Sequence, residues 1–213
     1  MAVLHITCEQ CGKAFSFTTL PAIDTGNDPS WHEKVRSGEA FAGVCPHCGD
    51  KKFYDYSFLY KERETHTLVY YAAGEEDFQE ACRTMTGQNP AVPWENISSW
   101  RRRIVANRDI LAEKLLILDA GLDDRFVEME KVLAYSFLQK KNPALLVDAV
   151  RFDGNKQEGY HIAFLLKGEI TGAYAFDMSL YKKLKATFAV KLKKTERTDI
   201  LIDSRWAAEM LKQ

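Results

Sequence analysis

The sequence predicts an α+β protein in which short N-terminal strands are followed by a helical hairpin, an antiparallel sheet and C-terminal helices. Three observations lead to this class. Aromatic runs alternate with turn residues up to about residue 73, apolar residues recur at helical spacing from about residue 108, and β-prone runs with turn signals follow. The 213 residues, 46% of them hydrophobic, suffice for one large domain or two small ones.

The first strands follow from alternating apolar residues. The lead-in at 3–6 and the run at 13–19 favour a β-hairpin closed by a turn. The insert at 21–43 contains Asp28-Pro29, where Asp can cap a helix and Pro suits its first turn. We therefore expect one short helix in the insert, ending near Gly38.

Two aromatic runs and an acidic segment come next. The runs at 51–60 and 65–73 are β-prone and joined by charged residues, which predicts an antiparallel hairpin. Residues 74–86 begin with carboxylates and carry an apolar stripe, as expected of a helix. The proline-containing loop at 88–100 is the best candidate for a domain boundary.

A helical hairpin is expected after a short strand at 101–105. Apolar residues from Ile110 to Leu118 have helical spacing, and Gly121 can end that helix. The next helix should start at Asp123 or Asp124, since carboxylates complement the positive end of the helix dipole. The cluster of carboxylates here is therefore interpreted as capping rather than as a cation or acid/base site.

The remaining chain predicts a meander of strands and then helices. The expected strands are 144–152, 159–169 and 170–177. The turn signals are Asp153-Gly154-Asn155 and Lys167-Gly168-Glu169. Residues 179–194 suggest a helix and a basic stretch, and residues 203–213 suggest a terminal amphipathic helix.

The cysteines form the clearest chemical pattern in the chain. Two CxxC turns can each bring two thiolates to one Zn²⁺ ion, and a glycine after each pair permits the tight turn. The predicted metal ligands are Cys8, Cys11, Cys45 and Cys48. Because thiolates fill every position of the tetrahedron, the expected zinc is structural rather than catalytic. The fifth cysteine, Cys82, is interpreted as a small core residue.

Thiol redox chemistry is the alternative for these cysteines. Cys45-Pro46-His47-Cys48 has the spacing of a thiol oxidoreductase motif, but such a motif follows a buried strand and opens a helix. Here a β-prone run follows it. The histidines near the pairs, His5, His32 and His47, are not predicted as ligands.

The two cysteine motifs and the segment at 103–131, RIVANRDILAEKLLILDAGLDDRFVEMEK, together resemble the CpXC domain family. This prokaryotic family is named for its cysteine motifs, and the resemblance covers roughly residues 1–140. The first motif, Cys8-Glu9-Gln10-Cys11, lacks the proline that the second has at Pro46. The resemblance supports a metal site and implies no activity, because the family is uncharacterised.

These observations divide the chain into a zinc-ribbon-like β region at 1–73 and an α+β region at 74–213, with the boundary possible anywhere within 74–99. The formal charge of -1, from 29 basic and 30 acidic residues, offers no overall field for polyanions. The N-terminus lacks the pattern of a signal peptide, and no apolar run is long enough for a membrane span. We therefore expect a cytoplasmic protein.

Three hypotheses for function follow. The leading one is a zinc-binding protein whose ribbon is a structural and macromolecular interaction module, for another protein ahead of nucleic acid. The others are an enzyme with an unidentified active site in the C-terminal half and a CxxC thiol redox protein. Nucleic acid could be contacted through a basic cluster beside Trp100, although alternate arginines of an edge strand more often simply face solvent. These arginines are Arg101, Arg102, Arg103 and Arg108.

Overall fold

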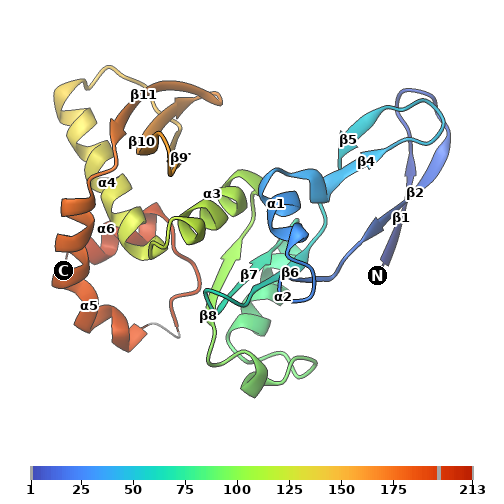
Figure 1. Ribbon diagram of the computed structural model, residues 1–213, viewed down its shortest axis with the longest axis horizontal. Helices are drawn as coiled ribbons and strands as arrows, with labels where there is room; N and C mark the ends of the chain where they lie inside the picture. Colours follow the sequence, from blue (N-terminus) through green and yellow to red (C-terminus); the bar gives the residue numbers. More distant parts are fainter. Residues whose placement is uncertain (1, 196–197, 213) are drawn as a thin grey trace. The chain divides into compact units, whose positions relative to one another are not determined.

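The computed structural model describes residues 2–195 and 198–212. Its contacts divide the chain into two compact units, Met1–Ala112 and Glu113–Gln213. The division falls within helix α3 (Arg108–Asp119) (Figure 1). The domain boundary expected between residues 74 and 99 concerns independent folding and stays a prediction.

The first unit is mostly β-structure. Its strands are β1 (Ala2–Thr7), β2 (Ala14–Thr19), β3 (Ala22–Asp24), β4 (Ala42–Val44), β5 (Lys51–Phe53), β6 (Phe58–Glu62), β7 (Thr67–Tyr71) and β8 (Arg101–Val105). Its helices are α1 (Ser30–Arg36) and α2 (Glu75–Met85), with 3-10 turns η1 (Glu39–Phe41) and η2 (Trp94–Asn96). The short helix predicted in the insert is α1, and the acidic segment forms α2 as expected.

Three sheets form in the first unit. β1 pairs with β2 and β4 with β5, each as an antiparallel hairpin, and the third sheet has the order β3-β6-β7-β8. The predicted antiparallel pairing of β6 with β7 is confirmed. The prediction of a single strand over 51–60 is wrong, because residues 51–53 pair with β4 and the chain then leaves that hairpin before β6 begins.

Aromatic side chains form much of the core of this unit. The rings of Phe41, Tyr56, Phe58 and Tyr71 pack with centroid separations between 5.1 and 5.7 Å. All four are buried, and such ring pairs add to the stabilisation from apolar burial. The core therefore follows from the aromatic runs that predicted the strands.

The second unit combines helices with a meander. Its helices are the rest of α3, α4 (Asp124–Lys141), α5 (Met178–Thr195) and α6 (Ser204–Leu211). Its strands are β9 (Ala149–Asn155), β10 (Gly159–Leu166) and β11 (Glu169–Ala175), which pair antiparallel in the order β11-β10-β9. The predicted meander and both C-terminal helices are confirmed, and the basic stretch proves to be part of α5.

The turns of the meander agree only partly with the sequence signals. Lys167 and Gly168 have positive φ and form the predicted second turn. Asp153-Gly154-Asn155 instead lies within β9, and the first turn is at 156–158. Gly154 remains in the strand with φ 115°, where a Cβ would lie 2.2 Å from the carbonyl oxygen of Gly159, so glycine is required by close backbone approach and not by a turn.

Helix α4 lies against β9 and β10 and is also packed by α5 and α6. Its start is the predicted one: Asp123 is the N-cap and accepts a hydrogen bond from the backbone N–H of Arg125. Gly121, with φ 69°, separates α3 from α4. The buried apolar residues of the unit surround these contacts, and they include Ile117, Phe126, Met129, Phe152, Phe164, Tyr181 and Leu192. Over the described ranges, no helix is both long and apolar enough to cross a membrane.

Candidate metal centre

The two CxxC turns have the same backbone geometry. In the first, the N–H of Cys8 donates to the carbonyl of Lys13 at 3.0 Å and the N–H of Gly12 donates to Cys8 at 2.8 Å. In the second, Cys45 and Asp50 make the equivalent bond at 2.8 Å and Gly49 donates to Cys45 at 2.9 Å. The chain thus forms the same turn twice.

Both turns need a residue in the left-handed region. Gly12 has φ 71° and Gly49 has φ 79°, and neither would bring a Cβ within 4 Å of another heavy atom. The requirement for glycine is therefore one of backbone conformation and not of space.

The hairpins β1-β2 and β4-β5 lie next to each other (Figure 1). The four predicted ligands in their turns come together. Their sulfur atoms all lie within 4.8 Å of one another. The distance is 3.7 Å between the sulfurs of Cys8 and Cys48 and 3.8 Å between those of Cys11 and Cys45. With Zn–S bonds of about 2.3 Å, the edge of a tetrahedron of sulfurs is about 3.8 Å, so the cluster fits a tetrahedral ion of this size.

The thiols differ in their protonation. Burial raises the pKa of Cys45, but hydrogen bonds from the backbone N–H groups of His47 and Cys48 outweigh it and lower the pKa to about 7. The backbone N–H of Asp50 favours the thiolate of Cys48, yet burial and the neighbouring sulfurs raise its pKa to about 12. Cys45 therefore ionises readily, whereas the neighbouring sulfur atoms oppose the ionisation of Cys48. A divalent cation at the centre would remove this resistance, because its charge favours all four thiolates.

Residues beside the cluster hold the two hairpins together. The ring of Tyr54, which follows β5, lies 5.5 Å from that of Phe17 and 6.3 Å from that of Phe15 on β2. Lys52 of β5 forms an ion pair with Glu9 of the first turn. Since both charged side chains are well exposed, the aromatic contacts contribute more than this ion pair to the joining of the hairpins.

The second motif does not have the setting of a thioredoxin-like active site. Cys45 to Cys48 lie in the turn between β4 and β5, and the chain continues from them into a strand. The helix N-terminus that lowers the pKa of a thiol in such enzymes is replaced here by the N–H groups of the turn itself.

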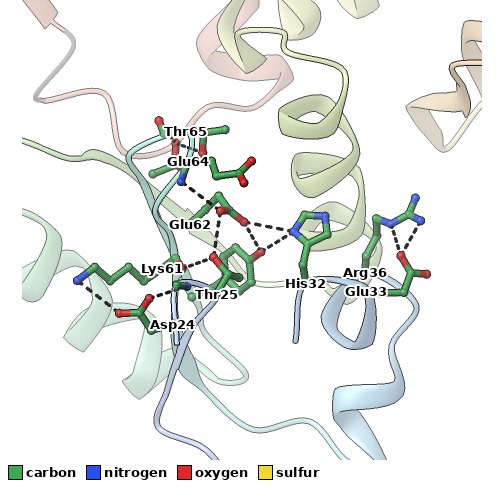
Figure 2. Close-up of polar contacts among 12 residues, drawn as sticks. Asp24, Thr25, His32, Glu33, Arg36, Lys61, Glu62, Glu64 and Thr65 are labelled. Atoms are coloured by element: carbon green, nitrogen blue, oxygen red, sulfur yellow. Dashed lines mark hydrogen bonds and ion pairs between the residues drawn. The ribbon is translucent and has the colours of Figure 1, made fainter. Parts of the chain in front are cut away.

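A second polar cluster in the first unit surrounds Glu62 (Figure 2). Its Oε1 accepts a hydrogen bond from Thr25 at 3.0 Å, and its Oε2 accepts one from the hydroxyl of Tyr60 at 2.9 Å. The Nδ1 of His32 lies 2.7 Å from the Tyr60 hydroxyl and 3.3 Å from Glu62 Oε2. Thr25 follows β3 and His32 belongs to α1, so the buried carboxylate ties the insert between the two cysteine pairs to β6.

This cluster was not predicted from the sequence, although a signal was present. In the alternation of β6, Phe58, Tyr60 and Glu62 occupy the inward positions, and all three are buried. A carboxylate on the inward side of a strand requires partners, which polar residues of the insert supply. His32 is thus engaged with Tyr60 and Glu62.

The predicted basic cluster is not the exposed surface that the sequence suggested. The expectation that alternate arginines of β8 face solvent is wrong, since Arg102 is 1% and Arg103 is 3% exposed. Helix α2 packs against β8, where Arg102 donates to the carbonyl of Met85 and Arg103 to that of Arg102. Arg101 is partly exposed, and the guanidinium of Arg108 lies 3.0 Å from the carboxylate of Asp55. Burial therefore removes two of the four arginines from any nucleic-acid surface.

Convergent polar groups are also present in the second unit, between α3 and α4. Lys131 Nζ lies 2.7 Å from Glu113 and 3.0 Å from Glu128, and Lys114 Nζ lies 3.0 Å from Asp124. Burial alone would lower the pKa of Lys131, but the carboxylates of Glu128 and Glu113 raise it above its usual value. All five side chains are buried and paired with one another, so the arrangement has the character of a structural network.

The fold and the cysteine cluster define an α+β protein with a four-thiol site that could hold a metal ion. The family model described as CpXC protein matches residues 6–131, which is more than half of the chain, and the chain therefore belongs to this family. The match includes both cysteine pairs, the Glu62 cluster, and α3 with the first part of α4. Neither the search of curated proteins nor that of solved structures gave a match.

Proposed function

We propose that the four cysteines bind one Zn²⁺ ion in a closed, structural site, and that the resulting zinc ribbon presents an interaction surface to another protein. The observation that carries the first part is the cluster of four sulfur atoms within 4.8 Å of one another, in which two separations, 3.7 and 3.8 Å, equal the edge of a zinc–thiolate tetrahedron. Four thiolates leave no position for water, so the ion stabilises the fold and performs no catalysis.

The ion would join two β-hairpins, each of which would have little stability by itself. An isolated two-stranded hairpin is marginally stable in water, and the first unit joins two of them through the cysteines and a few aromatic contacts. Zinc bonds would supply the stability that burial does not, as in other small zinc modules. Cytoplasmic location belongs to the same proposal, since a reducing compartment keeps such thiols available for metal.

The interaction surface is supported by apolar side chains on these hairpins. Val3 and Leu4 of β1, Val44 of β4 and Phe53 of β5 are large hydrophobic residues that remain exposed. Lys51 and Arg108 place their cations over the ring of Phe53. Exposed apolar and aromatic residues with neighbouring cations are common in protein-binding surfaces. A partner protein is therefore favoured over nucleic acid for this part of the chain.

Elemental analysis and thiol counting test the zinc site. Protein purified without added metal should contain one zinc ion per chain, with only Cys82 reacting with a thiol reagent until a chelator exposes the other four cysteines. The Cys45→Ser variant should lose most of the zinc, whereas Cys82→Ser, the matched control, should keep it. Metal-free protein with a disulfide between Cys45 and Cys48 would overturn the proposal in favour of redox chemistry.

Site-specific photo-crosslinking in the cells that produce the protein tests the interaction surface. A photoreactive phenylalanine analogue at position 53 should give an adduct with one partner protein, and the partner should be identified by mass spectrometry. The control position is Ile170 in the second unit, which is exposed to a similar degree. Adducts at both positions with the same mixture of abundant proteins would contradict a specific surface.

A further inference from the structure

Helix α5 carries a charge pattern unlike that of the rest of the protein. It contains six lysines and no acidic residue, in a chain whose formal net charge is -1. Five of the lysines are exposed, and none of the five has an ion pair with any residue in the described ranges. They are Lys182, Lys183, Lys185, Lys193 and Lys194.

A face that is only solvated usually mixes the two signs of charge. On α2 and α1, for example, Arg83 pairs with Glu80 and Arg36 with Glu33 at the i,i+3 spacing. On α5, Lys182 and Lys185 have the same spacing with like charges, which destabilises a helix. No carboxylate on α5 compensates this repulsion. The lysine pattern is therefore better explained by binding to an anionic partner than by a need for solubility.

The lysines of α5 form two groups. Lys182, Lys183 and Lys185 lie in the first half of the helix, and Lys193 and Lys194 lie at its end. Lys193 lies ten positions after Lys183, which corresponds to about 15 Å along the axis at about 1.5 Å per residue. The exposed residues between the groups are all uncharged, namely Ala186, Thr187, Ala189 and Val190.

The apolar side of α5 is already occupied. Tyr181, Leu184 and Leu192 are buried in the core of the second unit, packed with residues of α4 and the sheet. A basic helix that binds membranes buries its apolar face in the lipid, and here that face is not available. Val190, 75% exposed, is the one exposed large hydrophobic residue between the lysine groups, since Phe188 is partly buried. The solvent-facing side of α5 therefore presents two groups of positive charge with uncharged residues between them.

We propose that the solvent-facing side of α5 binds the phosphate backbones of duplex DNA, with one lysine group on each strand across the major groove. The groove of B-form DNA is about 12 Å wide, which the separation of the two groups spans. Contacts of this kind are electrostatic and independent of sequence, because lysine meets phosphates and the uncharged residues between offer few hydrogen bonds to bases. The helix lies outside residues 6–131, so this surface is independent of the proposed metal site.

Fluorescence anisotropy of the full-length protein with a labelled random-sequence 20-bp duplex tests the proposal. Five phosphate contacts predict a slope of about −4.5 for log K against log salt, or an affinity loss of about 500-fold between 50 and 200 mM. Two unrelated duplexes should bind equally. A variant with all five lysines replaced by Gln, which retains helix propensity, should lose binding at 50 mM salt while its circular dichroism stays unchanged.

Two matched double variants distinguish binding by the lysines of α5 from a non-specific effect of positive charge elsewhere on the protein. Lys193→Gln with Lys194→Gln should reduce the salt slope by about 2, whereas Lys140→Gln with Lys141→Gln, exposed at the end of α4, should leave it unchanged. Equal effects of the two pairs, or no binding by the wild type at 50 mM salt, would overturn the proposal. So would tighter, α5-dependent binding to vesicles of anionic phospholipid than to DNA, which would make a membrane surface the partner.

Discussion

The carboxylate of Glu130 accepts a hydrogen bond from the backbone N–H of Asp177 at 2.6 Å through Oε1, while its Oε2 is buried with no hydrogen-bond partner in the described part of the chain. Asp177 in turn caps α5 by accepting from the backbone N–H groups of Ser179 and Leu180. Burial, which outweighs the Asp177 hydrogen bond, raises the pKa of Glu130 to about 7. The junction of α4 with α5 therefore contains a carboxyl group that ionises near neutral pH.

The pH dependence of stability follows from this group. The folded state binds the proton of Glu130 more tightly than the unfolded state, so the contribution is fully favourable below about pH 4.5 and is lost as the pH rises to about 7. The loss corresponds to about 3 kcal/mol for a shift of this size. Glu130→Gln keeps an acceptor for Asp177 and cannot ionise, so it should stabilise the protein increasingly between pH 5 and pH 8.

Urea unfolding of both proteins at several pH values measures this difference. Glu169→Gln, an exposed position on β11, provides the control for removal of one negative charge from the same unit. A Glu130→Gln variant whose stability relative to wild type is the same at pH 5 and pH 8 would contradict the assignment.

The buried lysine network predicts a large effect from one substitution. Lys131→Met preserves much of the side-chain volume but leaves Glu113 without its 2.7 Å partner and Glu128 with one fewer cation. Removal of one member of a buried ion pair costs about 3–5 kcal/mol, because the remaining charge is desolvated and unpaired. Lys140→Met, on the exposed side of α4, should change the free energy of unfolding by less than about 0.5 kcal/mol. Similar losses in the two variants would show that the network contributes little.

The hydroxyl of Tyr60 should stabilise the attachment of the insert to the central sheet. Tyr60→Phe removes the bond to Glu62 and the contact with His32, and it leaves buried polar atoms less well satisfied. We expect a loss of about 1–3 kcal/mol in the free energy of unfolding of the first unit. Tyr70→Phe on the neighbouring strand is the control, since its hydroxyl makes no hydrogen bond within the described residues. Denaturant unfolding followed by tryptophan fluorescence compares the two, and equal losses would contradict the role of the cluster.

The sequence predictions succeeded where a structural feature is determined by residues close together in the chain. The helices α1, α3 and α4 were predicted from caps and apolar spacing, and Asp123 and Gly121 perform the capping roles assigned to them. The cysteine cluster was also foreseen, because a CxxCG turn fixes two sulfurs within a few residues and only the meeting of two such turns is a tertiary event.

The errors arose where distant packing decided the outcome. Nothing near Arg102 and Arg103 in sequence indicates that α2 will cover β8, and a charged run is normally solvated, so their burial could not be anticipated. Asp153-Gly154-Asn155 has the composition of a hairpin turn, but the register of β9 with β10 places Gly154 opposite Tyr160 and moves the turn along the chain. The break between β5 and β6 likewise depends on the pairing of residues 51–53 with β4.

The glycine at the end of each cysteine turn allows a final test of the proposed zinc site that leaves every ligand in place. Gly49→Ala forces alanine into φ 79° without a steric contact, which costs about 1–2 kcal/mol of backbone strain in the metal-bound turn. Competition with a chromophoric chelator should therefore show zinc affinity reduced roughly 5- to 30-fold. Gly49→Asn should lose less, because Asn tolerates the left-handed region better than Ala. Gly172→Ala, outside that region and with its Cβ 4.0 Å from Phe164, should retain wild-type affinity. If Gly49→Ala binds zinc as tightly as Gly172→Ala, the conformation of the turn is not coupled to metal binding.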